Sequence, residues 1–157
     1  MQRYIPLAIV LTALLVLAAY FGPRLYRGWQ FRRDCNAMLA DAQAGKLQGV
    51  IAAIDPTQQM QIGALLHQYV PADFSKSIKS LKLTRYEETE PNRVWAYITA
   101  RIDQGDAPGL YECRSRWIFD GKHWRWDFLE SYGAALSIDG DEQWVKLSDL
   151  VALAGQL

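Results

Sequence analysis

The chain opens with a long apolar segment. The 19 residues from Tyr4 to Gly22 contain no charged side chain. At about 1.5 Å per residue, a helix of this length reaches roughly 28 Å, close to the hydrocarbon thickness of a bilayer. This pattern predicts a transmembrane anchor over residues 1–23, ended by Pro23. A cleaved signal peptide is the alternative, since Arg3 precedes the run, but the run exceeds the ~7–15 residues of a signal-peptide core.

Aromatic and basic residues flank this segment. Tyr4 at one end, and Tyr20 and Phe21 at the other, are typical of interfacial anchors. Residues 24–33 then mix aromatic side chains with four arginines, so this juxtamembrane segment is able to contact anionic head groups or to act only as a topology signal. By the positive-inside rule the arginines favour a single-pass protein of a bacterial inner membrane, with its domain on the cytoplasmic rather than the periplasmic side. The arginines are Arg24, Arg27, Arg32 and Arg33.

Helical periodicity follows the arginines. A first domain helix is expected to end at Gly45. A short second helix is expected over residues 47–54, and a third near residues 57–69 before Pro71. The apolar positions of the first helix are Phe31, Cys35, Met38, Leu39 and Ala42.

From Ser77 onward the period changes to two, which indicates β-strands. Strands are predicted over residues 77–87, 93–102, 110–119 and 122–130, with Asp120-Gly121 as a hairpin turn. In the second strand, Val94, Ala96 and Ile98 share one face, and Trp95 and Tyr97 share the other. The tail is expected to turn at residues 139–141 and to form a short helix within residues 144–153.

These elements predict an α+β fold. In it, an N-terminal transmembrane helix precedes a domain over residues 34–157. That domain has three helices packed on a curved antiparallel sheet of about four strands.

Two segments resemble domains of the nuclear-transport-factor-2-like (SnoaL-like) family. They are AQAGKLQGVIAAIDP at residues 42–56 and RSRWIFDGKHWRWDF at residues 114–128. Lys46 stands where an acidic residue is common in that family. The resemblance implies a sheet wrapped around the helices into a cone, often with a pocket. Members include isomerases, dehydratases, binding modules and subunits of membrane complexes, so the fold does not settle the function.

Catalytic members of the family use ionisable side chains inside the cone. Asp127 would act as a general base if it pointed into an apolar pocket lined by Tyr69, Trp117 and Trp126. Alternation instead favours Trp126 in the core and Asp127 on the opposite face. Because no acid and base are paired at a useful spacing, we predict a protein that is not an enzyme. The ionisable candidates are His67, Tyr69, His123, Asp127 and Tyr132.

Metal and cofactor motifs are missing from the sequence. Its two histidines and two cysteines lack ligand spacing, and it has no glycine-rich phosphate loop. With 17 basic and 17 acidic residues, the formal net charge of zero gives no indication of nucleic acid binding. Cys35 and Cys113 both fall on predicted core faces. They could pair in an oxidising compartment or remain small buried apolar residues in the cytoplasm.

The leading functional prediction is a non-catalytic accessory or assembly subunit of a membrane protein complex. Its expected partners are membrane lipids and integral membrane proteins, and its expected contact residues are Trp95 and Tyr97, because exposed aromatics on a sheet favour interfaces. Packing of a C-terminal helix around Trp144 on that sheet face is the alternative role for these aromatics. Two other functions stay open: a cone that binds or converts a small hydrophobic molecule, and a peripheral module that binds anionic lipid.

Overall fold

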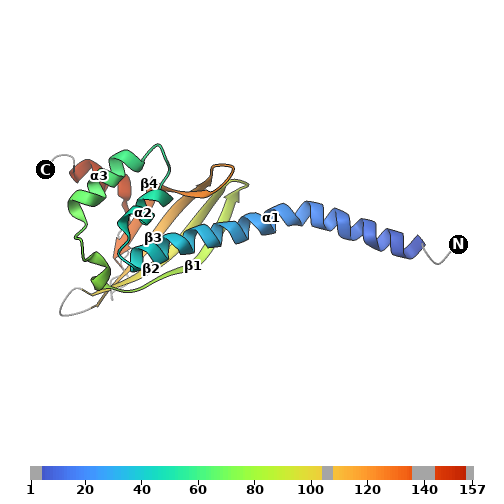
Figure 1. The fold of residues 1–157 in the computed structure, drawn as a ribbon, viewed down its shortest axis with the longest axis horizontal. Coiled ribbons are helices and arrows are strands. Elements are labelled where there is room, and N and C mark those ends of the chain that lie inside the picture. Colours follow the sequence, from blue (N-terminus) through green and yellow to red (C-terminus); the bar gives the residue numbers. More distant parts are fainter. Residues whose placement is uncertain (1–4, 104–107, 136–143, 155–157) are drawn as a thin grey trace.

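The computed structural model describes residues 5–103, 108–135 and 144–154 and shows an α+β fold (Figure 1). Five strands form one antiparallel sheet in chain order. The predicted anchor residue Tyr4 and the predicted turn at residues 139–141 lie outside the described residues. The elements are α1 (Ile5–Gln43), α2 (Leu47–Ala53), α3 (Gln59–Tyr69), a 3₁₀ turn η1 (Phe74–Ser77), β1 (Ile78–Glu90), β2 (Arg93–Asp103), β3 (Pro108–Phe119), β4 (Trp124–Ala135), β5 (Val145–Lys146) and α4 (Leu147–Ala154).

The sheet has one strand more than the sequence predicts. The four long strands lie where the period-two pattern places them, but β4 continues to Ala135. This extension pairs Tyr132 with Lys146 and Gly133 with Val145, and so creates β5. A two-residue strand has no period of its own, and pairing between distant segments cannot be read from local alternation.

The predicted transmembrane anchor is wrong for this structure. Among the residues described, no helix is both long enough and apolar enough to cross a membrane. The predicted anchor is not a separate element, because α1 is a single helix of 39 residues that begins in the apolar run and continues into the domain core. The single-pass topology and the inner-membrane location, on either side, are withdrawn with it. So are the anchoring roles of the flanking aromatic residues and arginines.

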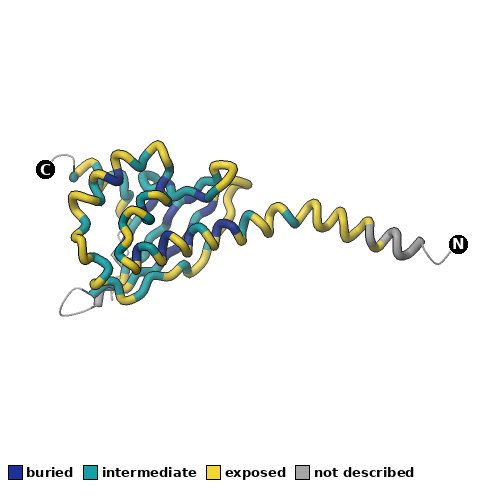
Figure 2. Tube along the Cα trace, viewed as in Figure 1, coloured by how far each residue is buried: buried dark blue, intermediate teal, exposed yellow. Residues whose placement is uncertain are grey.

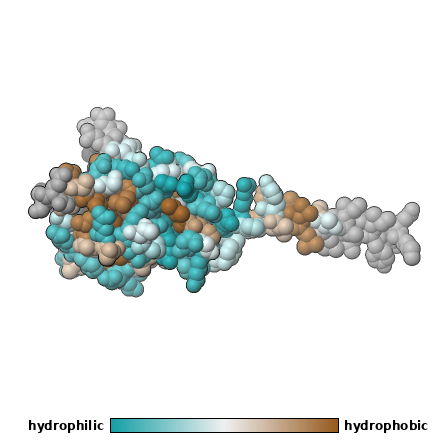
Figure 3. Space-filling model, turned by 90° about the horizontal axis from the view of Figure 1, so that it is seen from above, coloured by the Kyte–Doolittle hydropathy of each residue, from teal (hydrophilic) through white to brown (hydrophobic). Residues whose placement is uncertain are grey.

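The sequence predicts that Pro23 ends the helix, but Pro23 lies inside α1. A proline within a helix removes one backbone hydrogen bond and costs about 3 kcal/mol. Packing further along α1 offsets this cost, because Phe31, Cys35, Met38 and Leu39 are all buried against the sheet. The part of α1 before Pro23 projects from the domain (Figure 1). Exposed apolar side chains lie along it, among them Leu15 and Tyr20 (Figure 3).

The core lies between the helices and one face of the sheet, here called the core face (Figure 2). Phe31 is fully buried at its centre. Its ring centroid lies 4.9 Å from that of Tyr86, 5.7 Å from Trp117 and 5.6 Å from Trp124. Because Phe31 belongs to the segment that the sequence assigned to the membrane surface, the domain includes residues before position 34.

The two cysteines are free thiols that belong to this core. Burial raises the pKa of Cys35 to about 12, with a smaller contribution from Cys113. Burial also raises the pKa of Cys113 to about 12, with a smaller contribution from Glu112. Both therefore act as small apolar side chains in the folded protein.

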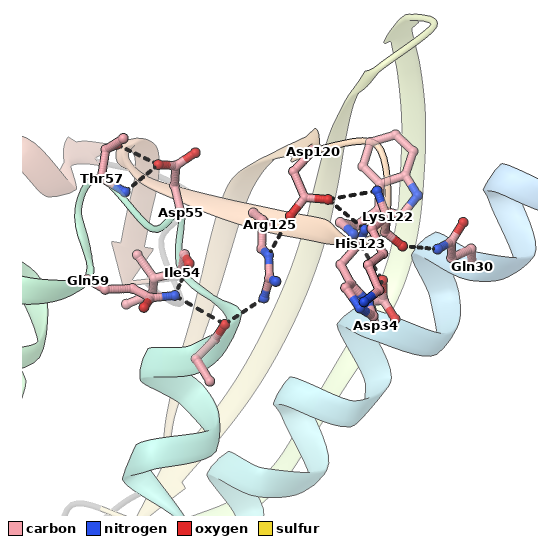
Figure 4. Close-up of polar contacts among 12 residues, drawn as sticks. Gln30, Asp34, Ile54, Asp55, Thr57, Gln59, Asp120, Lys122, His123 and Arg125 are labelled. Carbon is pink, nitrogen blue, oxygen red and sulfur yellow. Dashed lines mark hydrogen bonds and ion pairs between the residues drawn. The ribbon is translucent and has the colours of Figure 1, made fainter.

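Two hairpin turns at one end of the sheet are fastened to α1, and Figure 4 shows the contacts of the β3–β4 turn. Arg27 donates to the carbonyl of Pro91 at 3.0 Å in the β1–β2 turn. Asp34 accepts the backbone N–H of Trp124 at 3.0 Å, and Gln30 donates to the carbonyl of Lys122. Three side chains of α1, those of Arg27, Gln30 and Asp34, therefore hold the turns in place.

Asp120 organises the β3–β4 turn. Its Oδ1 accepts the backbone N–H groups of Lys122 at 2.8 Å and His123 at 2.7 Å, and its Oδ2 pairs with Arg125 at 3.0 Å. Desolvation favours the neutral carboxyl, but these hydrogen bonds outweigh it and lower the pKa of Asp120 to about 2. Gly121, at φ 98°, takes the left-handed conformation that the turn requires.

We expect Asp120→Ala to lower the free energy of unfolding by about 1–2 kcal/mol near neutral pH. This value allows for solvent screening, because the side chain of Asp120 is 34% exposed. A carboxyl whose pKa is lowered on folding stabilises the protein above its unfolded pKa of 3.8 and loses this effect toward pH 2. Urea unfolding of both proteins between neutral pH and pH 2 measures this difference. A difference between them that is independent of pH would contradict the assignment.

Candidate functional site

The sheet face opposite the core, here called the outer face, carries ordered rows of side chains. The described helices pack on the core face (Figure 1). On that face Leu147 of α4 lies next to Gly133 of β4. Strand register places residues in rows that run across the outer face from β1 to β4. One row consists of Arg85, Tyr97, Arg114 and Tyr132, and the next consists of Glu87, Trp95, Arg116 and Asp127.

Arginine and aromatic side chains stack on one another in these rows. The guanidinium carbon of Arg85 lies 3.8 Å from the ring centroid of Tyr97. That of Arg114 lies 4.7 Å from the ring of Trp95 and 5.7 Å from that of Tyr97. The rings of Trp95 and Tyr132 are 6.1 Å apart. The two predicted interface residues, Trp95 and Tyr97, therefore lie in one aromatic and cationic cluster of the outer face. Trp95 is half-buried there, whereas Tyr97 is only 8% exposed beneath the guanidinium groups and is not the exposed aromatic that the sequence predicts.

The arginines of the outer face differ in their ion pairs. Arg85 contacts Glu87 at 2.9 Å. Arg116 lies 3.8 Å from Asp127 and 3.9 Å from Glu130. Within the described chain, Arg114 has no ion pair, and its buried Nε has no hydrogen-bond partner.

Asp127, the predicted general base, belongs to a hydrogen-bonded network. Its Oδ1 accepts from Gln58 at 2.7 Å, and its Oδ2 lies beside Arg116. Ser131 donates to the Asp127 carbonyl at 2.7 Å and accepts the indole N–H of Trp126 at 2.9 Å. These contacts fix the shape of β4, where register shifts by several residues.

The other predicted site residues have separate partners. His67 is 2.8 Å from Gln48, and the Tyr69 hydroxyl donates to the Ala154 carbonyl at 3.1 Å. His123 lies 3.8 Å from Asp34 at the hairpin turn. Trp117 is fully buried beside Phe31, so it fills the core. Among the described residues, these side chains therefore have separate contacts, and the pocket of Tyr69, Trp117 and Trp126 stays a prediction.

A different hollow follows the boundary between α1 and β1. It is an open groove of about 720 Å³. Its walls contain charged, polar and apolar groups. The guanidinium carbon of Arg32 lies 5.2 Å from the ring centroid of Tyr86. None of the residues predicted from the sequence as site residues for a small ligand lies in it. The lining residues are Arg32, Asn36, Leu83, Thr84, Arg85 and Tyr86.

Sequence reasoning missed Arg85 and Arg114 as members of the outer surface. Alternation does place Arg114 opposite the buried Ser115, so a signal for its face exists. Arg85 follows a register shift between Leu83 and Arg85, which local alternation does not reveal. The rows arise only from pairing between strands.

Comparisons with known proteins give little further information. No protein-family model matches the chain, and no curated protein sequence matches it. The fold is similar to the solution structure of a SEC-C motif containing protein from Rhodopseudomonas palustris. The TM-score is 0.45 at 15% sequence identity, over 56% of this chain and 67% of that chain. A similarity this weak says nothing about function.

The comparisons do not bear out the predicted nuclear-transport-factor-2-like resemblance, since no model of that or any other family matches the chain. The matching structure is described as a SEC-C motif protein and not as a member of that family. The motifs behind the prediction were a glycine that ends a helix and an aromatic hairpin with an Asp-Gly turn. Glycines at helix ends and Asp-Gly hairpin turns occur in many folds, because both follow from local backbone geometry. The cone that the family implied is therefore withdrawn.

Proposed function

We propose that this chain is a non-catalytic protein-interaction domain that binds a partner protein through its outer face. The observation that carries the proposal is the row of Arg85, Tyr97, Arg114 and Tyr132 beside Trp95 on a sheet face away from the helices. Tyrosine, tryptophan and arginine are the residues most enriched at the energetic centres of protein interfaces. The predicted restriction to a membrane complex depended on the anchor and is not part of the proposal.

The state of the ionisable residues supports a binding role. Asp127 is buried and engaged by Gln58, and His67 and Tyr69 each contact a different part of the chain. A catalytic site needs an acid or base within hydrogen-bond reach of a common reacting centre. The separate contacts of these side chains support a structural role for them.

A photo-crosslinking amino acid tests the proposal in cells that make the protein. At Thr99, which lies on the outer face beside Tyr97 and is half-buried, we expect a discrete adduct with a partner protein. The matched position is Met60 on α3, which is 89% exposed and remote from the outer face in sequence and element. An adduct absent at Thr99, or equal at both positions, would overturn the proposal.

A further inference from the structure

We infer that the outer face recognises an acidic peptide segment of its partner, with one carboxylate bound by Arg114. This inference rests on the proposed function and names the chemistry of the partner. Its basis is the combination of stacked guanidinium groups and one arginine whose donors are unused.

Stacking fixes the orientation of the guanidinium groups. Arg85 and Arg114, on the two strands that flank β2, both lie against the ring of Tyr97. A guanidinium stacked on an aromatic ring keeps its N–H donors in its own plane, where they match the two oxygens of a carboxylate. Stacking therefore holds the arginine side chains in an orientation suited to bidentate binding. Less side-chain conformational entropy is then lost when a carboxylate binds.

Arg114 is the arginine with free donors. Glu87 engages Arg85, whereas Asp127 and Glu130 lie near Arg116. In the residues that the structure describes, Arg114 has no carboxylate partner, and its buried Nε is unbonded.

The surroundings favour a peptide over a nucleic acid. Guanidinium groups already cover faces of Trp95 and Tyr97, where unpaired bases would need to stack. The row beside Arg114 also carries Glu87 and Asp127, which repel a dense line of phosphates. A single carboxylate next to an apolar side chain meets less repulsion than a line of phosphates, and that apolar side chain can pack against the ring of Tyr132.

Selection from a displayed peptide library tests the inference. The probe library carries one Asp or Glu beside one Leu or Phe in each peptide, and a matched library carries Asn or Gln at the acidic position. We expect the wild-type protein to enrich the acidic library, and Arg114→Gln to weaken binding of the selected peptides about tenfold, the effect of losing a charged hydrogen-bond pair. Arg24→Gln makes the same charge change at an exposed position of α1, away from the outer face, and should leave binding within about twofold.

A second measurement needs no variant. The indole N–H resonance of Trp95 in the wild-type protein should shift on titration with a selected acidic peptide and stay fixed with its amide counterpart. Equal enrichment of both libraries, or equal loss of binding in the two arginine variants, would overturn the inference. Oligothymidylate that shifts the Trp95 resonance in place of the peptide would also overturn it, in favour of a nucleic acid.

The two proposals fail in distinguishable ways. If the Thr99 adduct forms in both the wild-type protein and Arg114→Gln while the acidic library is not enriched, the outer face binds a partner but not through a carboxylate. If no adduct forms from Thr99, both proposals are wrong.

Discussion

Replacement of Phe31 by Ala is expected to lower the free energy of unfolding by about 3–5 kcal/mol, the usual cost of truncating a buried phenylalanine. Phe31 is fully buried, and its ring touches aromatic side chains from β1, β3 and β4. Removing the ring leaves a cavity at the point where α1 meets three strands. Because a domain typically has ~5–15 kcal/mol of stability in total, the variant should unfold at much lower urea concentration.

Tyr26→Ala is the matched control for this variant. Tyr26 lies on the same helix and is also aromatic, but it is 60% exposed and contacts Trp29 near the surface. Its replacement should change stability by less than about 1 kcal/mol. Equal losses from Phe31→Ala and Tyr26→Ala in urea unfolding would contradict the position of α1 against the sheet.

Ser131→Ala is expected to cost about 2–4 kcal/mol, although it removes a single oxygen atom. The hydroxyl of Ser131 is fully buried and accepts the backbone N–H of Arg116 and the indole N–H of Trp126, both at 2.9 Å. It donates to the carbonyl of Asp127 at 2.7 Å. Removing it leaves one buried and two partly buried polar groups without this partner, which is costly wherever water cannot replace the hydroxyl.

Urea unfolding measures the loss for Ser131→Ala, and the indole N–H resonance of Trp126 reports the broken hydrogen bond directly. Ser77→Ala, on an exposed position of η1, should be near neutral. If Ser131→Ala unfolds with the wild-type midpoint and an unchanged Trp126 resonance, the network in β4 is wrong.

The sequence allowed the long strands and their faces to be predicted because a strand alternates its side chains locally. Val94 and Trp95 differ in face for this reason alone, and the Asp120-Gly121 turn is read from two residues. The irregular part of β4 could not be predicted. Arg114 and Arg116 are two residues apart, whereas their partners Tyr132 and Asp127 are five apart, and such a shift depends on the network around Ser131.

The residues of the candidate site could be predicted only in part, for the same reason. Trp95 and Tyr97 were predicted as interface residues from alternation, but their neighbours on other strands come from register. Arg85 and Tyr132 share the row of Tyr97 only because three strand pairs align. The extent of α1 was misjudged because its apolar run and Pro23 were interpreted locally, whereas the helix is stabilised by contacts with the distant sheet.

The attachment of both hairpin turns to α1 has a consequence for synthesis of the chain. Arg27 lies 64 residues before Pro91, in the β1–β2 turn, and 97 residues before Trp124, where β4 begins after the β3–β4 turn. It helps to hold both turns. Part of the buried side of α1 therefore stays uncovered on the ribosome until β4 has emerged. At translation rates of about 5–20 residues per second, this exposure lasts several seconds, a period in which chaperones or misfolding compete for the helix.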